Sequence, residues 1–108
     1  MTESEFNQQA EDLLRQIEDA IDESGADIDY DSPGGVLTLT FENDSQIIIN
    51  RQTPLKQIWL AARAGGFHFD YNEDKNQWQL AGQSTELFES LSEHCSAQAG
   101  TNVILKAA

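Results

Sequence analysis

Carboxylate side chains are concentrated in the first third of this 108-residue sequence. Residues 1–31 contain eleven Asp and Glu against one Arg, a net charge of −10, whereas residues 32–108 contain eight acids against five bases, a net charge of −3. Carboxylate oxygens are the ligands that hard metal cations prefer, and a strong negative field attracts basic protein surfaces. The first segment is therefore the candidate for binding cations or a basic partner, because uniform acidification for solubility would not produce this asymmetry.

Most of these carboxylates are carried by a predicted amphipathic helix over residues 3–23, which ends at Ser24-Gly25. Its apolar residues recur at spacings of three and four, the period of a helix with one buried face. They are Phe6, Ala10, Leu13, Leu14, Ile17 and Ile21. Like charges recur four residues apart near its end, as at Glu18 and Asp22, and each such pair destabilises an isolated helix by roughly a few tenths of a kcal/mol. We therefore expect either a function or a strong tertiary anchor to maintain them.

A short strand continues the row of carboxylates after the helix. Residues 27–31 alternate polar and apolar, so their three aspartates share one side, opposite Ile28 and Tyr30. Further strands follow, with hairpin-length connections between them. They are predicted at Val36–Glu42, Ser45–Arg51, Leu55–Ala62 (where the alanines leave a helix possible), Phe67–Tyr71 and Gln77–Leu80.

A second helix follows the strands. Ser84 is expected to cap it, and Gly100 to end it. Its apolar stripe is formed by Leu87, Phe88, Leu91 and Cys95, and residues 101–105 are expected to cover the core. The predicted fold class is α+β: a two-layer sandwich in which the N- and C-terminal helices pack on one face of a five- to six-stranded antiparallel sheet. The whole chain, residues 1–108, is expected to form one domain.

An exposed tryptophan is predicted on the other face of this sheet. Alternation places Gln57 and Trp59 on the side opposite Ile58 and Leu60, which should face the helices. A tryptophan among amide side chains is typical of a protein-binding hot spot. The alternative is a partly covered tryptophan that packs on its neighbours.

Several classes of protein are excluded by composition. The net charge of −13 repels nucleic-acid phosphates and anionic lipid head groups. No apolar run approaches the ~20 residues that span a bilayer, the N-terminal residues do not resemble a signal or transit peptide, and a single cysteine excludes an internal disulfide. These features favour a soluble protein of a reducing compartment. The sequence contains no glycine-rich phosphate loop, GxSxG or HExxH motif, so we expect no enzyme.

The stretch Asn50–Leu60, NRQTPLKQIWL, resembles the signature of the frataxin family. The segments Gly35–Phe41 and Gly65–Asp70 resemble the same family, and the helix–sheet–helix order with an acidic first helix extends the resemblance over nearly the full chain. The N-terminus is similar to that of the bacterial branch. The resemblance implies a cytoplasmic iron-binding protein of iron–sulfur cluster assembly, whose partners are a cysteine desulfurase and the scaffold protein, and which is a monomer or forms oligomers with iron.

The resemblance also implies where binding occurs. Family members bind Fe²⁺ and Fe³⁺ weakly along an acidic ridge formed by the first helix and the first strand, and Ca²⁺, Mn²⁺, Co²⁺ or lanthanides should compete there. Carried onto this chain, the acidic ridge comprises Glu11, Glu18, Asp19, Asp22, Glu23, Asp27, Asp29 and Asp31. The expected partner-binding residues are Glu18, Asp19, Asp22, Glu23, Asn50, Gln52, Gln57 and Trp59.

Other interpretations remain open at this point. The ridge could be a solvated helix face, and the chain could be a generic cation buffer or a mimic of nucleic acid without a role in cluster assembly. Catalytic oxidation of Fe²⁺ would need a buried di-metal cage, which exposed acids on one helix face do not provide. His68 is expected as a surface residue beside Asp70, and Cys95 as a core residue, so a metal site formed by Cys95 and His94 is not expected.

Overall fold

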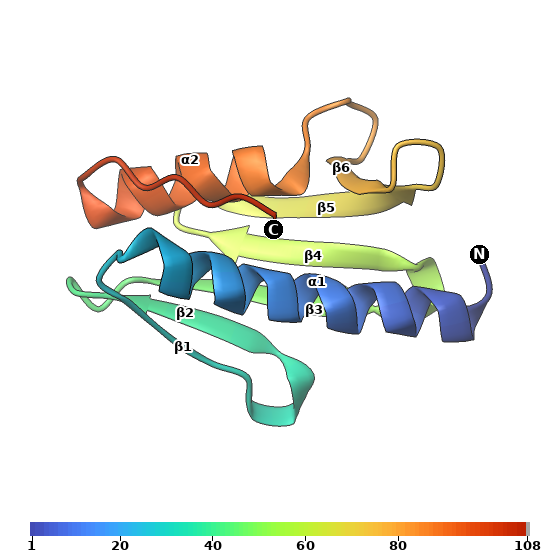
Figure 1. Ribbon diagram of the computed structural model, residues 1–108, viewed down its shortest axis with the longest axis horizontal. Helices are drawn as coiled ribbons and strands as arrows, with labels where there is room; N and C mark the ends of the chain where they lie inside the picture. The colour runs from blue at the N-terminus through green and yellow to red at the C-terminus, as the bar shows by residue number, and fades with distance from the viewer. Residues whose placement is uncertain (108) are drawn as a thin grey trace.

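The computed structural model describes residues 1–107, which fold into two layers: a six-stranded sheet and two helices that cover one of its faces (Figure 1). All neighbouring strands are antiparallel, and their order in the sheet is their order in the chain. The predicted α+β sandwich is confirmed, with six strands. The elements are α1 (Glu3–Ser24), β1 (Ile28–Asp31), β2 (Leu37–Phe41), β3 (Gln46–Gln52), β4 (Gln57–Ala62), β5 (Gly65–Asn72), β6 (Gln77–Leu80) and α2 (Leu87–Ala99).

Helix α1 forms where its apolar stripe predicts it. Thr2 and Glu5 build a capping box, in which Glu5 N donates to Thr2 Oγ1 at 3.1 Å and Thr2 N donates to Glu5 Oε1 at 2.9 Å. At the other end Gly25 adopts a φ of 69°, the left-handed conformation that glycine tolerates best. All six predicted stripe residues are buried, so α1 is anchored along its length.

The start of α2 corrects one prediction. Glu86, not Ser84, is the N-cap, and its carboxylate accepts a hydrogen bond from Phe88 N at 2.7 Å. The chain is still held in extended form at this point, because Leu80 N bonds to Thr85 O at 2.8 Å and Glu86 bridges to Gln79. The helix can begin only after that bridge. Partial burial raises the pKa of Glu86, although its backbone hydrogen bonds act in the opposite direction.

The strand predicted from Leu55 begins two residues later. Residues 53–55 form a 3₁₀ turn, and Lys56 follows with a φ of 52°. Leu55 is therefore 58% exposed instead of belonging to the sheet. From Gln57 onward the segment is a strand, so the helical alternative raised by its alanines is wrong.

The core lies between the sheet and the helices. The inward residues of β2, β3 and β4 and Phe69 of β5 are buried as alternation predicts, among them Leu39, Ile49 and Leu60, each at most 1% exposed, whereas Phe67 and Tyr71 of β5 are half-buried at the margin of this core. Trp78 of β6 joins this core at 5% exposure, with its ring in edge contact with Phe6 and Tyr71. Burial of this layer is the main stabilising contribution to the fold.

The last residues complete the core, as predicted. Ser96 Oγ donates to Val103 O at 3.0 Å and accepts from Val103 N at 2.9 Å. Ser92 makes the same pair of bonds to Leu105, at 3.1 and 2.8 Å. Val103 and Leu105 are 6% and 3% exposed. The two serines thus hold an extended segment on α2 while its alternate side chains close the core.

Candidate metal-binding and protein-docking surfaces

The acidic ridge is assembled from α1, from β1, which is one of the two edge strands of the sheet, and from Asp27 just before it. Tyr30 Oη of β1 donates to both carboxylate oxygens of Asp22, at 2.8 and 3.1 Å. Ser32 Oγ lies 3.5 Å from Glu18 Oε2. These contacts hold the second half of α1 against the edge strand, so carboxylates from two elements lie along one edge of the molecule.

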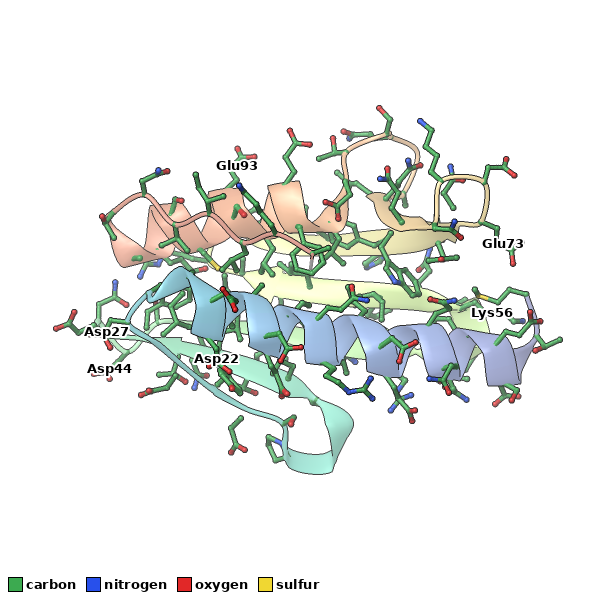
Figure 2. The ribbon with its side chains drawn as sticks, viewed as in Figure 1. Asp22, Asp27, Asp44, Lys56, Glu73 and Glu93 are labelled. Atoms are coloured by element: carbon green, nitrogen blue, oxygen red, sulfur yellow. The ribbon has the colours of Figure 1, made fainter. Side chains whose placement is uncertain are left out.

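The ridge side chains face solvent. All eight are exposed except Glu18, which is half-buried. Asp22 and Asp27 lie in the half of the molecule opposite Lys56 and Glu73 (Figure 2). Within residues 1–107 no three Asp, Glu, His or Cys side chains converge into a group that could hold a metal ion. The ridge is therefore an open row of carboxylates without a preformed coordination cage.

The two ends of the ridge differ in their counter-ions. At the N-terminal end Arg51 lies 3.6 Å from Glu11, and Arg15 lies 3.1 Å from Asp12, a neighbour of the ridge. No ridge carboxylate from Glu18 to Asp31 forms an ion pair with a residue in the described part of the chain. The C-terminal end is therefore where the negative potential is least compensated.

Tyr30 responds to this potential. The hydrogen bond to Asp22 raises the pKa of the phenol above its ordinary value, and desolvation and the charges of Asp22, Glu18 and Asp19 act in the same direction. The sequence analysis assigned Tyr30 no role and predicted only that its side chain lies opposite those of the three aspartates. Its contact with Asp22 could not be anticipated, since it depends on how β1 lies against α1.

Trp59 lies on the face of the sheet that the helices leave uncovered. Its neighbours Ile58 and Leu60 are at most 1% exposed and face the core, so the predicted outward orientation is confirmed. The cross-strand partners of Gln57 and Trp59 are Gln52 and Asn50 on β3. The four predicted amide and indole side chains are therefore direct neighbours on two adjacent strands.

Two neighbours fix the indole. The ring stacks on His68 of β5 with centroids 4.2 Å apart and an interplanar angle of 7°. Trp59 Nε1 donates to Gln57 Oε1 at 3.0 Å, and Gln57 Nε2 donates to Asp70 Oδ1 at 3.1 Å. Trp59 is accordingly half-buried, as the alternative of a partly covered tryptophan expects, while it still belongs to an open surface. We call Asn50, Gln52, Gln57, Trp59 and His68 the Trp59 surface.

His68 is exposed and lies on the same strand face as Asp70, as predicted, but its stacking on Trp59 was missed. The register of β4 with β5, which places His68 opposite Trp59, is the signal that would have found it. His94 contacts Phe67 with ring centroids 4.5 Å apart. Cys95 is completely buried, and this desolvation raises the pKa of its thiol to about 12. These two neighbours on α2 therefore point into different surroundings.

Comparison with known proteins shows the family to which this chain is related. The family model described as the frataxin-like domain matches residues 1–101. The chain belongs to the frataxin family. A curated relative within this family, the iron-sulfur cluster assembly protein CyaY of Vibrio parahaemolyticus serotype O3:K6, is 48% identical over 103 residues, which cover 95% of this chain and 97% of that protein.

Solved frataxin structures share the fold. Frataxin from Psychromonas ingrahamii, studied as a model of stability modulation within the CyaY family, superposes with a TM-score of 0.88 at 44% identity, covering 98% of this chain and 99% of that one. Yeast frataxin superposes with a TM-score of 0.63 at 28% identity, covering 86% and 79% of the two chains. The resemblance to the bacterial, CyaY-type branch is thereby confirmed. No helix within residues 1–107 has the length and apolar character needed to cross a bilayer.

Proposed function

We propose that this frataxin-family chain is a non-enzymatic adaptor of iron–sulfur cluster assembly. It binds Fe²⁺ and Fe³⁺ weakly on the acidic ridge and docks on a cysteine desulfurase. The observation that carries the role in cluster assembly is the 48% identity, over nearly the whole of both chains, to a protein named for that process. A cytoplasmic location and a monomeric state without iron belong to the same proposal.

The chemistry of the ridge supports weak iron binding. Its ligands are carboxylates alone, exposed to water and not drawn together into a cage. Such donors suit hard cations, and they give low selectivity because no fixed geometry discriminates among ions. Iron is therefore a cargo bound in competition with Ca²⁺, Mn²⁺, Co²⁺ and lanthanides, and the region of the ridge without ion pairs, Glu18 to Asp31, should bind it first.

Docking of a protein partner depends on the negative electrostatic potential of the same ridge, which acts at longer range than metal coordination. The uncompensated carboxylates attract the basic surface of a desulfurase, and they orient the two proteins before contact. The Trp59 surface then offers an uncharged contact area with a pre-positioned aromatic side chain, the kind of group that dominates the energy of protein interfaces. The scaffold protein or the desulfurase is its proposed partner.

Reconstitution with a purified desulfurase and scaffold tests this proposal. The variant Glu18→Gln/Asp19→Asn/Asp22→Asn keeps the size of each side chain and should weaken both Fe²⁺ binding and desulfurase capture. A matched control, Glu73→Gln/Glu89→Gln/Glu93→Gln, removes the same charge from exposed positions outside the ridge.

Together the two variants distinguish an effect of the ridge carboxylates from an effect of the net charge of the protein. Equal loss of binding in both would mean that net charge alone acts. Capture of basic nucleic-acid-binding proteins with no effect on cluster assembly would instead favour a nucleic-acid mimic, and iron binding with no effect on assembly would favour a cation buffer.

A further inference from the structure

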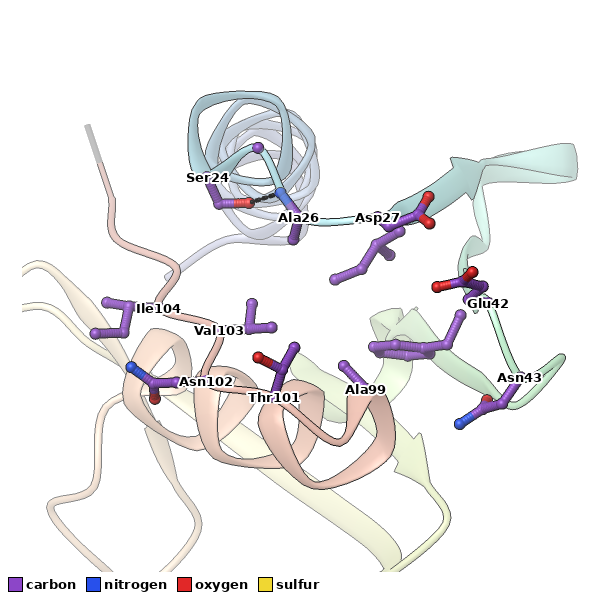
Figure 3. Close-up of a pocket in the computed structure, with 13 residues that line it drawn as sticks. Ser24, Ala26, Asp27, Glu42, Asn43, Ala99, Thr101, Asn102, Val103 and Ile104 are labelled. Carbon is purple, nitrogen blue, oxygen red and sulfur yellow. Dashed lines mark hydrogen bonds between the residues drawn. The ribbon is translucent and has the colours of Figure 1, made fainter.

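A pocket lies at the end of the molecule where both helices stop. It is a pocket of about 680 Å³ between the C-terminal ends of α1 and α2, the start of β1, the end of β2 and the segment after α2 (Figure 3). This volume falls within the range of pockets that hold small organic ligands. The pocket shares only Asp27 with the acidic ridge, and none of its residues belongs to the Trp59 surface.

The floor of the pocket is apolar. Ile28, Phe41 and Val103 line it and belong to the core, with exposures of 7%, 3% and 6%. Ala26 and Ala99 form its sides, and their small side chains leave the space open. An apolar group seated here would contact the exposed edges of these core residues and would cover Ile104, which also lines the pocket and is 57% exposed.

One wall is anionic. Ile28 pairs with Phe41 in the β1–β2 ladder, so Asp27 and Glu42 come next to each other where the ladder ends, and Figure 3 shows both on the same side of the pocket. Neither carboxylate has an ion-pair partner within residues 1–107, and no Lys, Arg or His lines the pocket.

Both helices add to the negative potential. The last residue of α1, Ser24, and the last residue of α2, Ala99, line the pocket. The C-terminal end of a helix carries a partial negative charge from its unpaired carbonyl groups. Four sources of negative potential therefore surround an apolar floor.

We propose that this pocket binds a small organic cation, an ammonium or guanidinium group joined to an apolar body about the size of a phenyl ring. The charged group would lie at the wall formed by Asp27 and Glu42, and the apolar body on Ile28, Phe41 and Val103. A metal ion would make no use of this floor, and a neutral apolar molecule would make no use of the wall.

Amide NMR titration of the full chain with phenethylamine tests the proposal. Phenethylamine should shift the resonances of Ala26, Ile28, Phe41 and Thr101. The neutral isostere 2-phenylethanol should bind about fivefold more weakly, the range expected for loss of exposed ion pairing. Ammonium chloride at equal concentration should leave these resonances unchanged. Shifts centred on residues 11–23, equal binding of the amine and the alcohol, or equal effects of ammonium chloride would each overturn the proposal.

Variants separate the pocket from the ridge. Glu42→Gln, at an exposed position outside the ridge, should weaken phenethylamine binding about threefold. Glu89→Gln, at the opposite end of α2, is the matched control and should leave it unchanged. Ala26→Leu should abolish binding by filling the pocket. Unaltered binding in Glu42→Gln and in Ala26→Leu would refute the site, while leaving the proposed role in cluster assembly untouched.

Discussion

The acidic ridge and the Trp59 surface differ in charge, in rigidity and in the range over which they can act. The ridge is a row of solvent-exposed carboxylates whose second half has no ion pairs in the described part of the chain. The Trp59 surface consists of amides around an indole that is stacked and hydrogen-bonded in place. Long-range attraction acts on the rate of association, whereas a pre-positioned aromatic side chain acts on the lifetime of a complex. Under the proposed function, the ridge therefore speeds association with a partner and the Trp59 surface prolongs the complex, and the two roles lie on different elements.

Removing the indole should have the largest effect. Trp59→Ala is expected to cost about 2 kcal/mol of partner binding, roughly a thirtyfold loss of affinity, because a buried aromatic anchor dominates an interface. Fe²⁺ binding on the ridge should not change. Calorimetric titration against each partner measures the partner affinity, and a separate titration with Fe²⁺ measures the iron affinity. Ile48→Ala, which truncates another exposed residue of the same sheet face, is the control. A partner affinity insensitive to Trp59→Ala would remove the retaining role of this surface.

Neutralising the ridge should have a smaller effect, confined to association. The Glu18→Gln/Asp19→Asn/Asp22→Asn variant is expected to lower the association rate with a basic partner about tenfold at low ionic strength, and by less as salt screens the field. Stopped-flow measurements at increasing NaCl check this. Trp59→Ala should instead raise the dissociation rate with little dependence on salt. If both variants changed the same rate constant, the separation of the two surfaces would be wrong.

A third prediction concerns the cost of the acidic ridge to the stability of the folded chain. Asp19→Asn/Glu23→Gln removes a like-charged pair at a spacing of four residues near the C-terminal end of α1, where the helix dipole also disfavours anions. The double variant should be more stable by about 0.5 kcal/mol, and its Tm higher by about 2–4 °C. Differential scanning calorimetry measures this, and millimolar Ca²⁺ should raise the Tm of the unmodified chain more than that of the variant. An unchanged Tm would mean that the ridge imposes no cost on folding.

The smallest expected effect is a shift in the pKa of Tyr30, which depends on the ridge and not on the Trp59 surface. Its pKa is raised above 10.0 in the folded chain, so the unfolded chain loses this proton first and the contribution of Tyr30 to stability falls as pH rises above about 10. Asp22→Asn should bring the pKa of Tyr30 back towards its ordinary value, and Ca²⁺ bound at Asp22 should act in the same direction. Absorbance titration with Tyr30→Phe as the reference measures this. A pKa unaffected by Asp22→Asn would show that the hydrogen bond does not persist in solution.

The helices and strands could be predicted from the sequence because the pattern of apolar residues in each has a short period. The stripe of α1 and the alternation of β2 to β5 each repeat over two to four residues, so the side that faces the core can be determined without the rest of the chain. The same alternation placed Trp59 outward. The error at Ser84 arose where a local capping preference competed with a bridge between residues 79 and 86, which belongs to the tertiary structure.

Contacts between elements could not be predicted in this way. The Tyr30–Asp22 hydrogen bonds depend on the position of β1 beside α1, the ion pair of Arg51 joins residues forty positions apart, and the stacking of His68 on Trp59 requires the register of β4 with β5. The pocket at the helix ends likewise combines three stretches of the chain, residues 24–28, 41–43 and 99–104, none of which has a distinctive composition of its own. The period of the sequence pattern determines which way a side chain points, whereas the register of the strands and the packing of the helices determine which residues it contacts.

The burial of Cys95 has a consequence for sulfur chemistry. A thiol transfers or accepts sulfur as the thiolate, and a group that is enclosed in the core and stays protonated up to about pH 12 is not available for that reaction. The proposed docking on a cysteine desulfurase therefore does not include uptake of a persulfide on this cysteine.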